Sequence, residues 1–432
     1  MKSGLLSTTF IAVLLGIPAC SGQPVIDRAD VTRIITTLAA DDMEGRATFS
    51  EGIERAAGFI ENEFDEIGLG FMPGATSYLQ AFQVYSLTPG EQSFSLNGRP
   101  IPDESVFSMG NHERLSWTTA DNISVTRLGP DDDFRSGVLS RRGSTESEII
   151  LVDESHADDF ARFRPFFSRP QRSTSLNEGG TTVFILTRLS AARTYRIEID
   201  RTSETLDLAN VVGVIPGNRE EETVLFSGHY DHLGIRPAVN ADSIANGAND
   251  DASGTTAVIE LARYFKALGK PERTLIFAAF TAEEIGGYGS QHLSHILNPD
   301  QVVAMFNIEM IGKPAVDGPN TAWITGFDRS DFGTILQKAV EGTRFSFYPD
   351  PYPDQNLFYR SDNATLARLG VPAHSISTTP IDVDTDYHQV SDEVETLNLD
   401  HLTNTISAIA AGAATIVSGA ETPTRIDPST VN

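Results

Sequence analysis

The sequence is poor in cysteine, in positive charge and in long apolar runs, and each shortage excludes a class of protein. The single cysteine, Cys20, cannot form an internal disulfide. There are 32 Lys and Arg residues against 59 Asp and Glu residues, and the formal net charge of -27 repels nucleic acid and anionic lipid surfaces. Beyond the N-terminus no run approaches the about 18 apolar residues that a membrane-spanning helix needs. What remains is an ordinary globular composition, with 40% hydrophobic and 21% charged residues.

The N-terminus is the one strongly apolar part of the chain. Lys2 precedes an apolar run that ends near Leu15, and small residues follow as far as Cys20. This pattern predicts a signal peptide over residues 1–20, because the apolar run is too short for a permanent anchor. A cysteine at the cleavage point resembles a lipobox, although Pro18 is not the usual residue there. We therefore expect a periplasmic protein anchored as a lipoprotein through Cys20; cleavage near Ala19 without lipidation is the alternative.

Two separated segments, residues 25–90 and 206–420, carry the pattern of one α/β domain. In the first, Ile53, Ile60 and Phe64 fall on one helical face. In the second, apolar strands alternate with helices, the clearest of which runs from about residue 255 to 268. This alternation predicts a mixed, largely parallel sheet with helices on both faces. Ligands in such folds bind beyond the carboxyl ends of the strands.

The segment between these parts, residues 91–205, has strand-like runs separated by polar loops and no helix of convincing period. It predicts a β-rich insert. The Pro-containing residues 421–432 predict a disordered tail.

Metal-ligating side chains follow five successive elements of the second segment. Since the carboxyl ends of parallel strands meet at one edge of a sheet, these side chains should converge there. Imidazole and carboxylate are the ligands of zinc and related divalent ions, and the set exceeds what one tetrahedral zinc requires. It suits two ions about 3.5–4 Å apart with a bridging carboxylate, leaving one carboxylate as a base. The residues are His229 and Asp231, Asp250, Glu283 and Glu284, Glu309, and His388.

In this order the motifs resemble the zinc-dependent exopeptidase family that includes bacterial leucyl aminopeptidases and glutamate carboxypeptidase II. The resemblance covers most of residues 208–402 and a lead-in at residues 42–46. It implies two zinc ions, peptide substrates and, after the bridging aspartate, a cis peptide bond between Asp250 and Asp251. The insert is loosely similar to the protease-associated domain that many relatives carry at this place; a family-specific β insert is the alternative.

The resemblance also implies a role for each matching residue. Glu283 would be the general base. Asp231 would hydrogen-bond the far nitrogen of His229 and fix its tautomer. The ligand assignment is His229 and Glu309 for one ion, Glu284 and His388 for the other, and Asp250 as the bridge. Many relatives carry Asp in place of Glu309. His232, His292 and His295 we interpret as structural.

The resemblance favours an exported aminopeptidase. A carboxypeptidase or dipeptidase on the same metal site is the main alternative, because polarity depends on the group that clamps the substrate terminus. A receptor-like module without catalysis is disfavoured, since all five ligand positions and the base are filled. A glutaminyl cyclase would use a single zinc, so metal stoichiometry distinguishes it.

Overall fold

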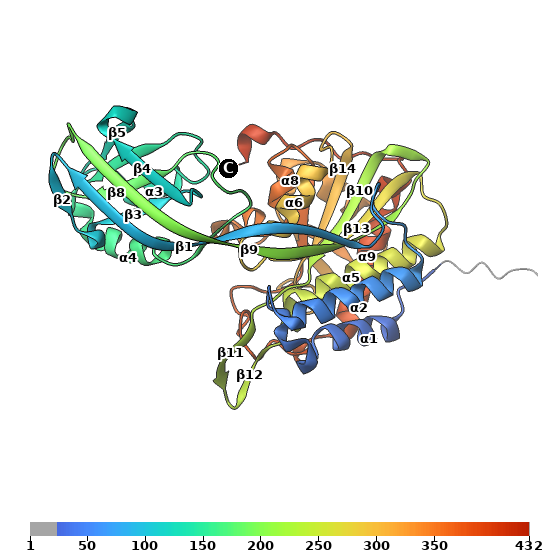
Figure 1. Ribbon diagram of the computed structural model, residues 1–432. Coiled ribbons are helices and arrows are strands. Elements are labelled where there is room, and N and C mark those ends of the chain that lie inside the picture. The colour runs from blue at the N-terminus through green and yellow to red at the C-terminus, as the bar shows by residue number, and fades with distance from the viewer. Residues whose placement is uncertain (1–23, 432) are drawn as a thin grey trace, which may run out of the picture.

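The computed structural model describes residues 24–431, so the predicted signal peptide and Cys20 lie outside the described residues. Figure 1 shows a larger body and a smaller lobe, joined by two long paired strands. The helices are α1 (Arg28–Leu38), α2 (Glu51–Ile67), α3 (Phe134–Leu139), α4 (Ala157–Phe167), α5 (Ser253–Ala267), α6 (Tyr288–Ile296), α7 (Phe332–Ala339), α8 (Asn363–Ala367) and α9 (Leu399–Val417). Within the described residues, none of them is long and apolar enough to cross a membrane.

The centre of the body is a run of parallel strands, as the sequence predicts. β10 (Arg219–His229) pairs in parallel with both β13 (Arg273–Phe280) and β14 (Val302–Ile308), and β14 pairs in parallel with β17 (Ala373–Ser377). Antiparallel neighbours flank this core. β9 (Tyr195–Ile215) lies beside β13, and β15 (Thr321–Ile324) lies between β17 and β16 (Ser346–Pro349). The predicted mixed, largely parallel sheet is therefore confirmed.

Helices cover both faces of this sheet because successive strand residues point to opposite sides. On β10, Val224 and Phe226 join the core under α1, α2, α5, α7 and α9, whereas Leu225 joins the core under α6 and α8. Phe226 stacks on Phe277 of β13 and Phe306 of β14, with ring centroids 5.3 and 4.8 Å apart. Burial on both faces explains why these strands read as continuous apolar runs.

The smaller lobe grows out of the body on β1 (Leu79–Leu96) and β9, which pair antiparallel along most of their length with a register shift between Pro89 and Gln92. The body and the insert therefore share these strands, and the predicted boundaries near residues 90 and 205 fall inside them. Edge strands β2 (Arg99–Ile101), β4 (Arg114–Thr118) and β7 (Gln171–Ser173) extend this ribbon. A second sheet holds β3 (Val106–Met109), β8 (Thr182–Leu186), β6 (Glu148–Val152) and β5 (Ser124–Leu128), in that order.

The insert also contains helices that the sequence pattern did not predict. α4 packs Phe160 into an apolar cluster with Phe107 and Phe184 on one face of the second sheet. Its apolar positions, Phe160, Phe163 and Phe167, do have helical spacing, but the helix has only 11 residues and contains Pro165. A helix of this length repeats its apolar spacing too few times for the pattern to be recognised among the surrounding polar loops. The insert is thus mixed, with β-strands still its main element.

The sequence predicts a disordered tail over residues 421–432. In the structure, residues 421–431 pack on the body instead. Ile426 is 2% exposed within the core under α8, and its backbone N–H donates to Gly370 O at 3.1 Å. The Arg425 guanidinium donates to the carbonyls of Pro299 and Val302 at 3.0 and 2.9 Å. One buried isoleucine and irregular backbone contacts leave no periodic signal in the sequence.

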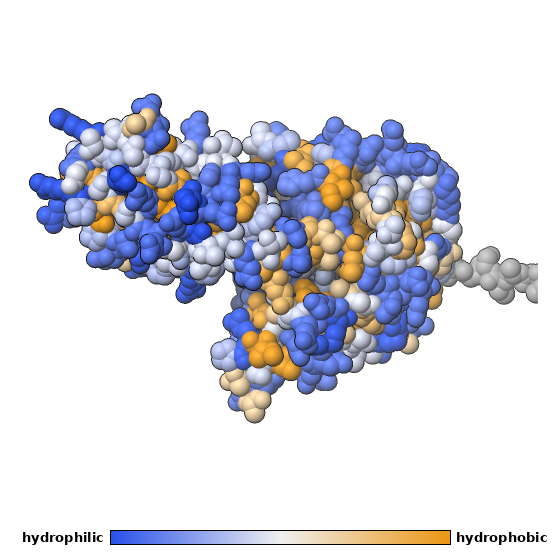
Figure 2. All heavy atoms as spheres, viewed as in Figure 1, coloured by the Kyte–Doolittle hydropathy of each residue, from blue (hydrophilic) through white to orange (hydrophobic). Residues whose placement is uncertain are grey.

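A hairpin of β11 (Gly234–Val239) and β12 (Asp242–Ala245) projects from the body near the carboxyl ends of the parallel strands. Ile235 and Val239 are exposed on it, and Figure 2 shows apolar surface here as at several other places on the same face.

Candidate metal centre

The predicted ligands do converge at one edge of the sheet. His229 is the last residue of β10, Glu283 and Glu284 follow β13, and Glu309 follows β14. Asp250 lies in the short helical turn Ala248–Ala252 that leads into α5, and its peptide bond to Asp251 is cis, as the resemblance implied. His388 comes from the loop after β17.

Asp250 lies between the two predicted ion positions. Its Oδ1 is 3.2 Å from His229 Nε2, and its Oδ2 is 3.2 Å from His388 Nε2. His388 Nε2 is also 3.2 Å from Glu284 Oε2. Donor atoms at 2.0–2.1 Å from one tetrahedral ion lie about 3.3 Å from one another, so these separations fit shared zinc ligands. The donor atoms of His229, Asp250 and Glu309 likewise all lie within 4.8 Å of one another.

The polar atoms at the centre lack the partners that a closed protein core would give them. His229 Nε2 and Glu284 Oε1 are buried and have no hydrogen-bond partner among residues 24–431. Buried polar groups are normally paired, and each one left unpaired costs about 1–3 kcal/mol. Several carboxylates are buried here with few cations, which is also costly unless a positive ion compensates. The donor set and its charge therefore fit a pair of divalent cations.

The carboxyl groups respond to this crowding. Burial raises the pKa of Glu309 to about 7 and that of Asp362 to about 6. Burial, with Glu309 and Asp362 nearby, raises the pKa of Glu283 well above its usual range. Burial by itself lowers the pKa of His388, but hydrogen bonding and charge from Asp250 and Glu284 raise it to about 10. The site thus strongly favours added positive charge.

Asp231 differs from its predicted contact. Its carboxylate is 3.8 Å from His229 Nδ1, whereas its backbone carbonyl is 3.1 Å from that nitrogen. The carbonyl can accept only if Nδ1 carries the proton, which leaves Nε2 free to bind an ion. The carboxylate instead accepts the backbone N–H groups of Glu283 at 3.0 Å and Glu284 at 3.3 Å. The side chain of Asp231 therefore holds the loop that carries both glutamates.

Three further charged residues, which the sequence did not single out for these roles, hold the ligand loops. The carboxylate of Asp251 accepts the backbone N–H groups of His229 and Met310 at 3.1 and 3.0 Å, joining the ends of β10 and β14. Asp392 accepts the N–H of Asp250 at 3.0 Å. The fully buried guanidinium of Arg46 donates to carbonyls on three segments. Of these three residues, only Arg46 lies in a motif that the sequence analysis identified, the lead-in at residues 42–46.

His232 lies inside the cluster, although its sequence context predicted a structural role. Its Nδ1 is 2.7 Å from Glu284 Oε1 and 3.8 Å from Asp250 Oδ2. The other two histidines agree with the structural interpretation. His292 stacks on Phe82 with ring centroids 4.3 Å apart, and His295 is exposed at the end of α6.

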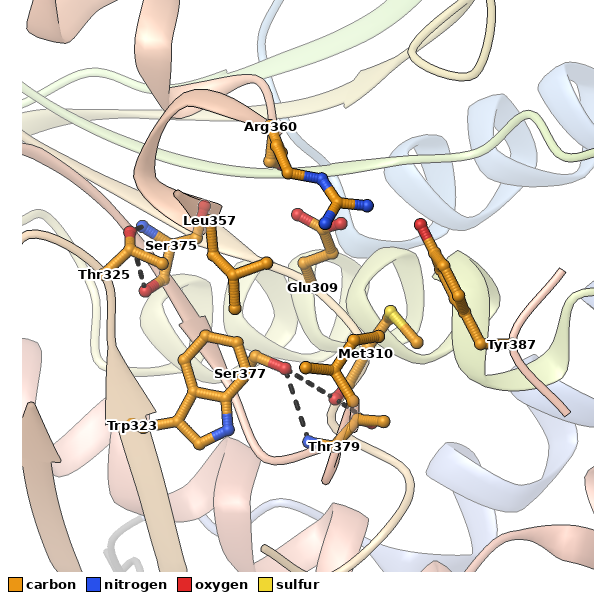
Figure 3. A pocket seen from close by; sticks show the side chains of 12 residues that line it. Glu309, Met310, Trp323, Thr325, Leu357, Arg360, Ser375, Ser377, Thr379 and Tyr387 are labelled. Atoms are coloured by element: carbon orange, nitrogen blue, oxygen red, sulfur yellow. Dashed lines mark hydrogen bonds between the residues drawn. The ribbon is translucent and has the colours of Figure 1, made fainter. Parts of the chain in front are cut away.

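A pocket opens beside Glu309 (Figure 3). Trp323 and Leu357 form part of its apolar wall, and Tyr387 stands at the side that faces the ligand loops. Ser361 also lines it, and its hydroxyl accepts from Asn307 Nδ2 at 2.7 Å. The carboxylate of Asp362 does not cap α8; it is buried with neither oxygen in a hydrogen bond among residues 24–431.

Comparison with known proteins agrees with this geometry. Residues 210–413, which hold every predicted ligand, match the model of peptidase family M28. This region is therefore similar to M28 peptidases. It matches the zinc exopeptidase family that the motifs resemble, as the sequence predicts.

Two curated relatives illustrate the range of similarity to this chain. A probable zinc metalloprotease of Leptosphaeria maculans is 39% identical over 113 residues, which are 26% of this chain and 26% of that protein. Leucine aminopeptidase 1 of Penicillium rubens is 28% identical over 332 residues, covering 67% of this chain and 84% of the relative. The chain thus spans about a quarter of the length of the first relative and most of the second.

Solved structures share the fold at lower identity. The zinc aminopeptidase of Bacillus subtilis superposes with a TM-score of 0.54 at 16% identity, over 94% of this chain and 98% of that one. The aminopeptidase of Aneurinibacillus sp. strain AM-1 gives a TM-score of 0.52 at 18% identity, over 94% and 96%. The body and the insert together therefore have an architecture already known among solved proteins.

Proposed function

We propose that the protein is a two-zinc aminopeptidase that removes single residues from the N-termini of peptides. The observation that carries the proposal is the position of Asp250, whose two carboxylate oxygens each lie 3.2 Å from a different histidine. The M28 match supports peptide hydrolysis, and relatives named leucine aminopeptidase 1 and zinc metalloprotease support the choice of reaction and metal.

Each ion would have its own ligand set. His229, Glu309 and Asp250 Oδ1 would hold one ion, and Glu284, His388 and Asp250 Oδ2 would hold the other. When bound, the ions supply Lewis acidity, which makes water more acidic and polarises a peptide carbonyl.

Glu283 is the residue that moves the proton. Its half-buried carboxylate takes a proton from the attacking water and returns it to the amine that leaves. The two N–H contacts of Asp231 with Glu283 and Glu284 fix the loop, so the base and a ligand are held together. A base with an upward-shifted pKa is suited to holding that proton between the two steps.

The charge of the site favours the N-terminal end of a peptide. Glu283 and Asp362 are carboxyl groups that the two ions would not use, and when ionised they would attract an α-ammonium and repel an α-carboxylate. One observation favours the carboxypeptidase or dipeptidase alternative. Arg360 is the cation among the pocket residues, and its guanidinium lies near Glu309 in Figure 3, where it could pair with a carboxylate.

A panel of free-amine and N-blocked peptides, with and without chelator, separates these readings. Release of N-terminal residues from free-amine peptides only, abolished by chelator and unaffected by Arg360→Met, is the expected result. Cleavage of blocked peptides from the C-terminal end, lost in Arg360→Met, would instead establish the carboxypeptidase reading.

Export and membrane attachment are part of the proposal and rest on residues 1–20 alone. The mature chain begins at Cys20 and carries lipid on it, which holds the enzyme at a periplasmic membrane surface. Cell fractionation of the native protein and Cys20→Ala tests this. We expect the native protein with membranes and the variant away from them; equal distribution of the two would contradict lipidation.

A further inference from the structure

His232 has no role in the ligand assignment above, yet its donor atom lies within 4.8 Å of those of Asp250 and Glu284. It follows Asp231 on the turn after β10, and its side chain is fully buried. Nδ1 lies 2.7 Å from Glu284 Oε1, and the ring is edge-on to that of His388 with centroids 5.9 Å apart. The loop at Gly247 leaves room for this ring because glycine has no side chain. A Cβ at that position would lie 2.5 Å from the ring.

Among residues 24–431, no residue forms an aligned hydrogen bond with either ring nitrogen of His232. Neither nitrogen has a hydrogen bond that is both short and aligned, so the contact with Glu284 has hydrogen-bond length but the ring is turned out of line. A structural histidine in a core normally has a partner for at least one nitrogen. His374 is an example, with Ser330 at 2.7 Å and the Thr325 carbonyl at 2.8 Å.

The distances separate a ligand from a residue that supports a ligand. The three contacts among Asp250, Glu284, His229 and His388 are 3.2 Å, close to the about 3.3 Å expected between two donors on one tetrahedral zinc. The His232 contact of 2.7 Å is shorter and has the length, though not the alignment, of a charge-assisted N–H···O bond. It reaches Oε1, while Oε2 of the same glutamate faces His388.

We propose that His232 is a positioning residue for the second ion. With the proton on Nδ1, it donates to Oε1 of Glu284 and turns Oε2 toward His388 and Asp250. Hydrogen bonds to the unused oxygen of a carboxylate ligand orient that ligand and tune metal affinity. The inference rests on the two-ion centre of the proposed function, but not on its reaction.

Zinc binding to the metal-free, full-length chain tests the proposal. The second ion is isolated in a Glu309→Ala background, and its affinity is measured by competition with a chromophoric chelator. His232→Asn keeps an amide N–H near the place of Nδ1, whereas His232→Gln moves it toward the place of Nε2. His401→Gln is the matched control, because His401 is 2% exposed, also lacks ring partners and lies on α9.

We expect His232→Gln to weaken the second ion by about 10–100-fold, the usual effect of losing an outer contact. His232→Asn should stay within a few-fold of native, and His401→Gln should match native. Native affinity in His232→Gln would show a structural residue and overturn the proposal. Equal weakening in both His232 variants would show that the imidazole itself binds zinc, which also overturns it. Thermal unfolding of the metal-free variants checks the fold. A protein that binds two ions in this way but cleaves no peptide would refute the proposed function alone.

Discussion

Asp231→Asn distinguishes the contact found in the structure from the one that the sequence predicted. The carboxylate accepts two backbone N–H groups, from Glu283 and Glu284, and the Thr48 hydroxyl at 3.1 Å. An asparagine has one acceptor oxygen in place of two, so its NH₂ group must face a buried donor. The tautomer of His229 depends on the backbone carbonyl of residue 231, which the substitution leaves in place.

The magnitude follows from the lost contact. One hydrogen bond to a charged group is removed and one buried donor is left unpaired, which costs about 2 kcal/mol. If the loop shifts to relieve this, Glu284 leaves its position and the cost appears in metal binding. Since about 1.4 kcal/mol corresponds to tenfold, the second ion should bind about 30-fold more weakly. The first ion, held by His229 and Glu309, should be little affected.

Two single-site backgrounds make the assay specific. Glu309→Ala leaves the ion at Glu284 and His388, and His388→Ala leaves the ion at His229. Zinc affinity is measured in each with and without Asp231→Asn, and Thr48→Ala serves as the control that removes only the hydroxyl contact. Loss confined to the His229 ion would refute the reasoning, because it would mean that the Asp231 side chain acts on the tautomer after all.

Three further predictions concern metal, pocket and pH. Chelator should lower the melting temperature and zinc should restore it, since an ion at 100 times its Kd adds about 2.7 kcal/mol; Asp250→Ala should lose both ions and this response. Trp323→Ala enlarges the pocket and should raise the kcat/KM ratio for bulky over small terminal side chains by about tenfold or more; an unchanged ratio would place the specificity pocket elsewhere. Burial raises the pKa of Glu260 to about 7 from 4.5, so the folded state holds this proton more tightly and stability is lost as pH rises from 4.5 to 7. Glu260→Gln should therefore be more stable at pH 8, by about 1–3 kcal/mol, with no gain at pH 4; denaturant unfolding at both pH values checks this.

His229, Glu284 and Glu309 could be predicted because each lies at or just after the end of an apolar strand, and parallel strands bring their carboxyl ends to one edge. Position along the chain therefore carried His229, Glu284 and Glu309 into one site. The role of His232 could not be predicted in this way, since a second histidine after a ligand motif has the same local pattern whether it supports a ligand or fills a core. Its orientation depends on the space above Gly247, which only the folded chain defines.

The contacts of Asp231, the helix α4 and the packing of the C-terminal segment could not be predicted from the sequence, for related reasons. Spacing placed Asp231 beside His229 but could not tell a side-chain contact from a backbone one. α4 has too few turns for its period to be recognised, and the C-terminal segment is held by Ile426 and Arg425 through contacts that have no periodicity. The structure of such regions depends on packing between segments that are distant in the sequence.

The central claim is a two-ion centre bridged by Asp250 with Glu283 as the base, and metal content measured beside hydrolysis in Glu283→Gln tests it most directly. Glutamine has nearly the same shape and cannot take the proton, so we predict two zinc ions per chain and a loss of at least about 100-fold in kcat on a free-amine peptide. Near-native hydrolysis by Glu283→Gln with two ions bound, or native protein that binds fewer than two, would contradict the account.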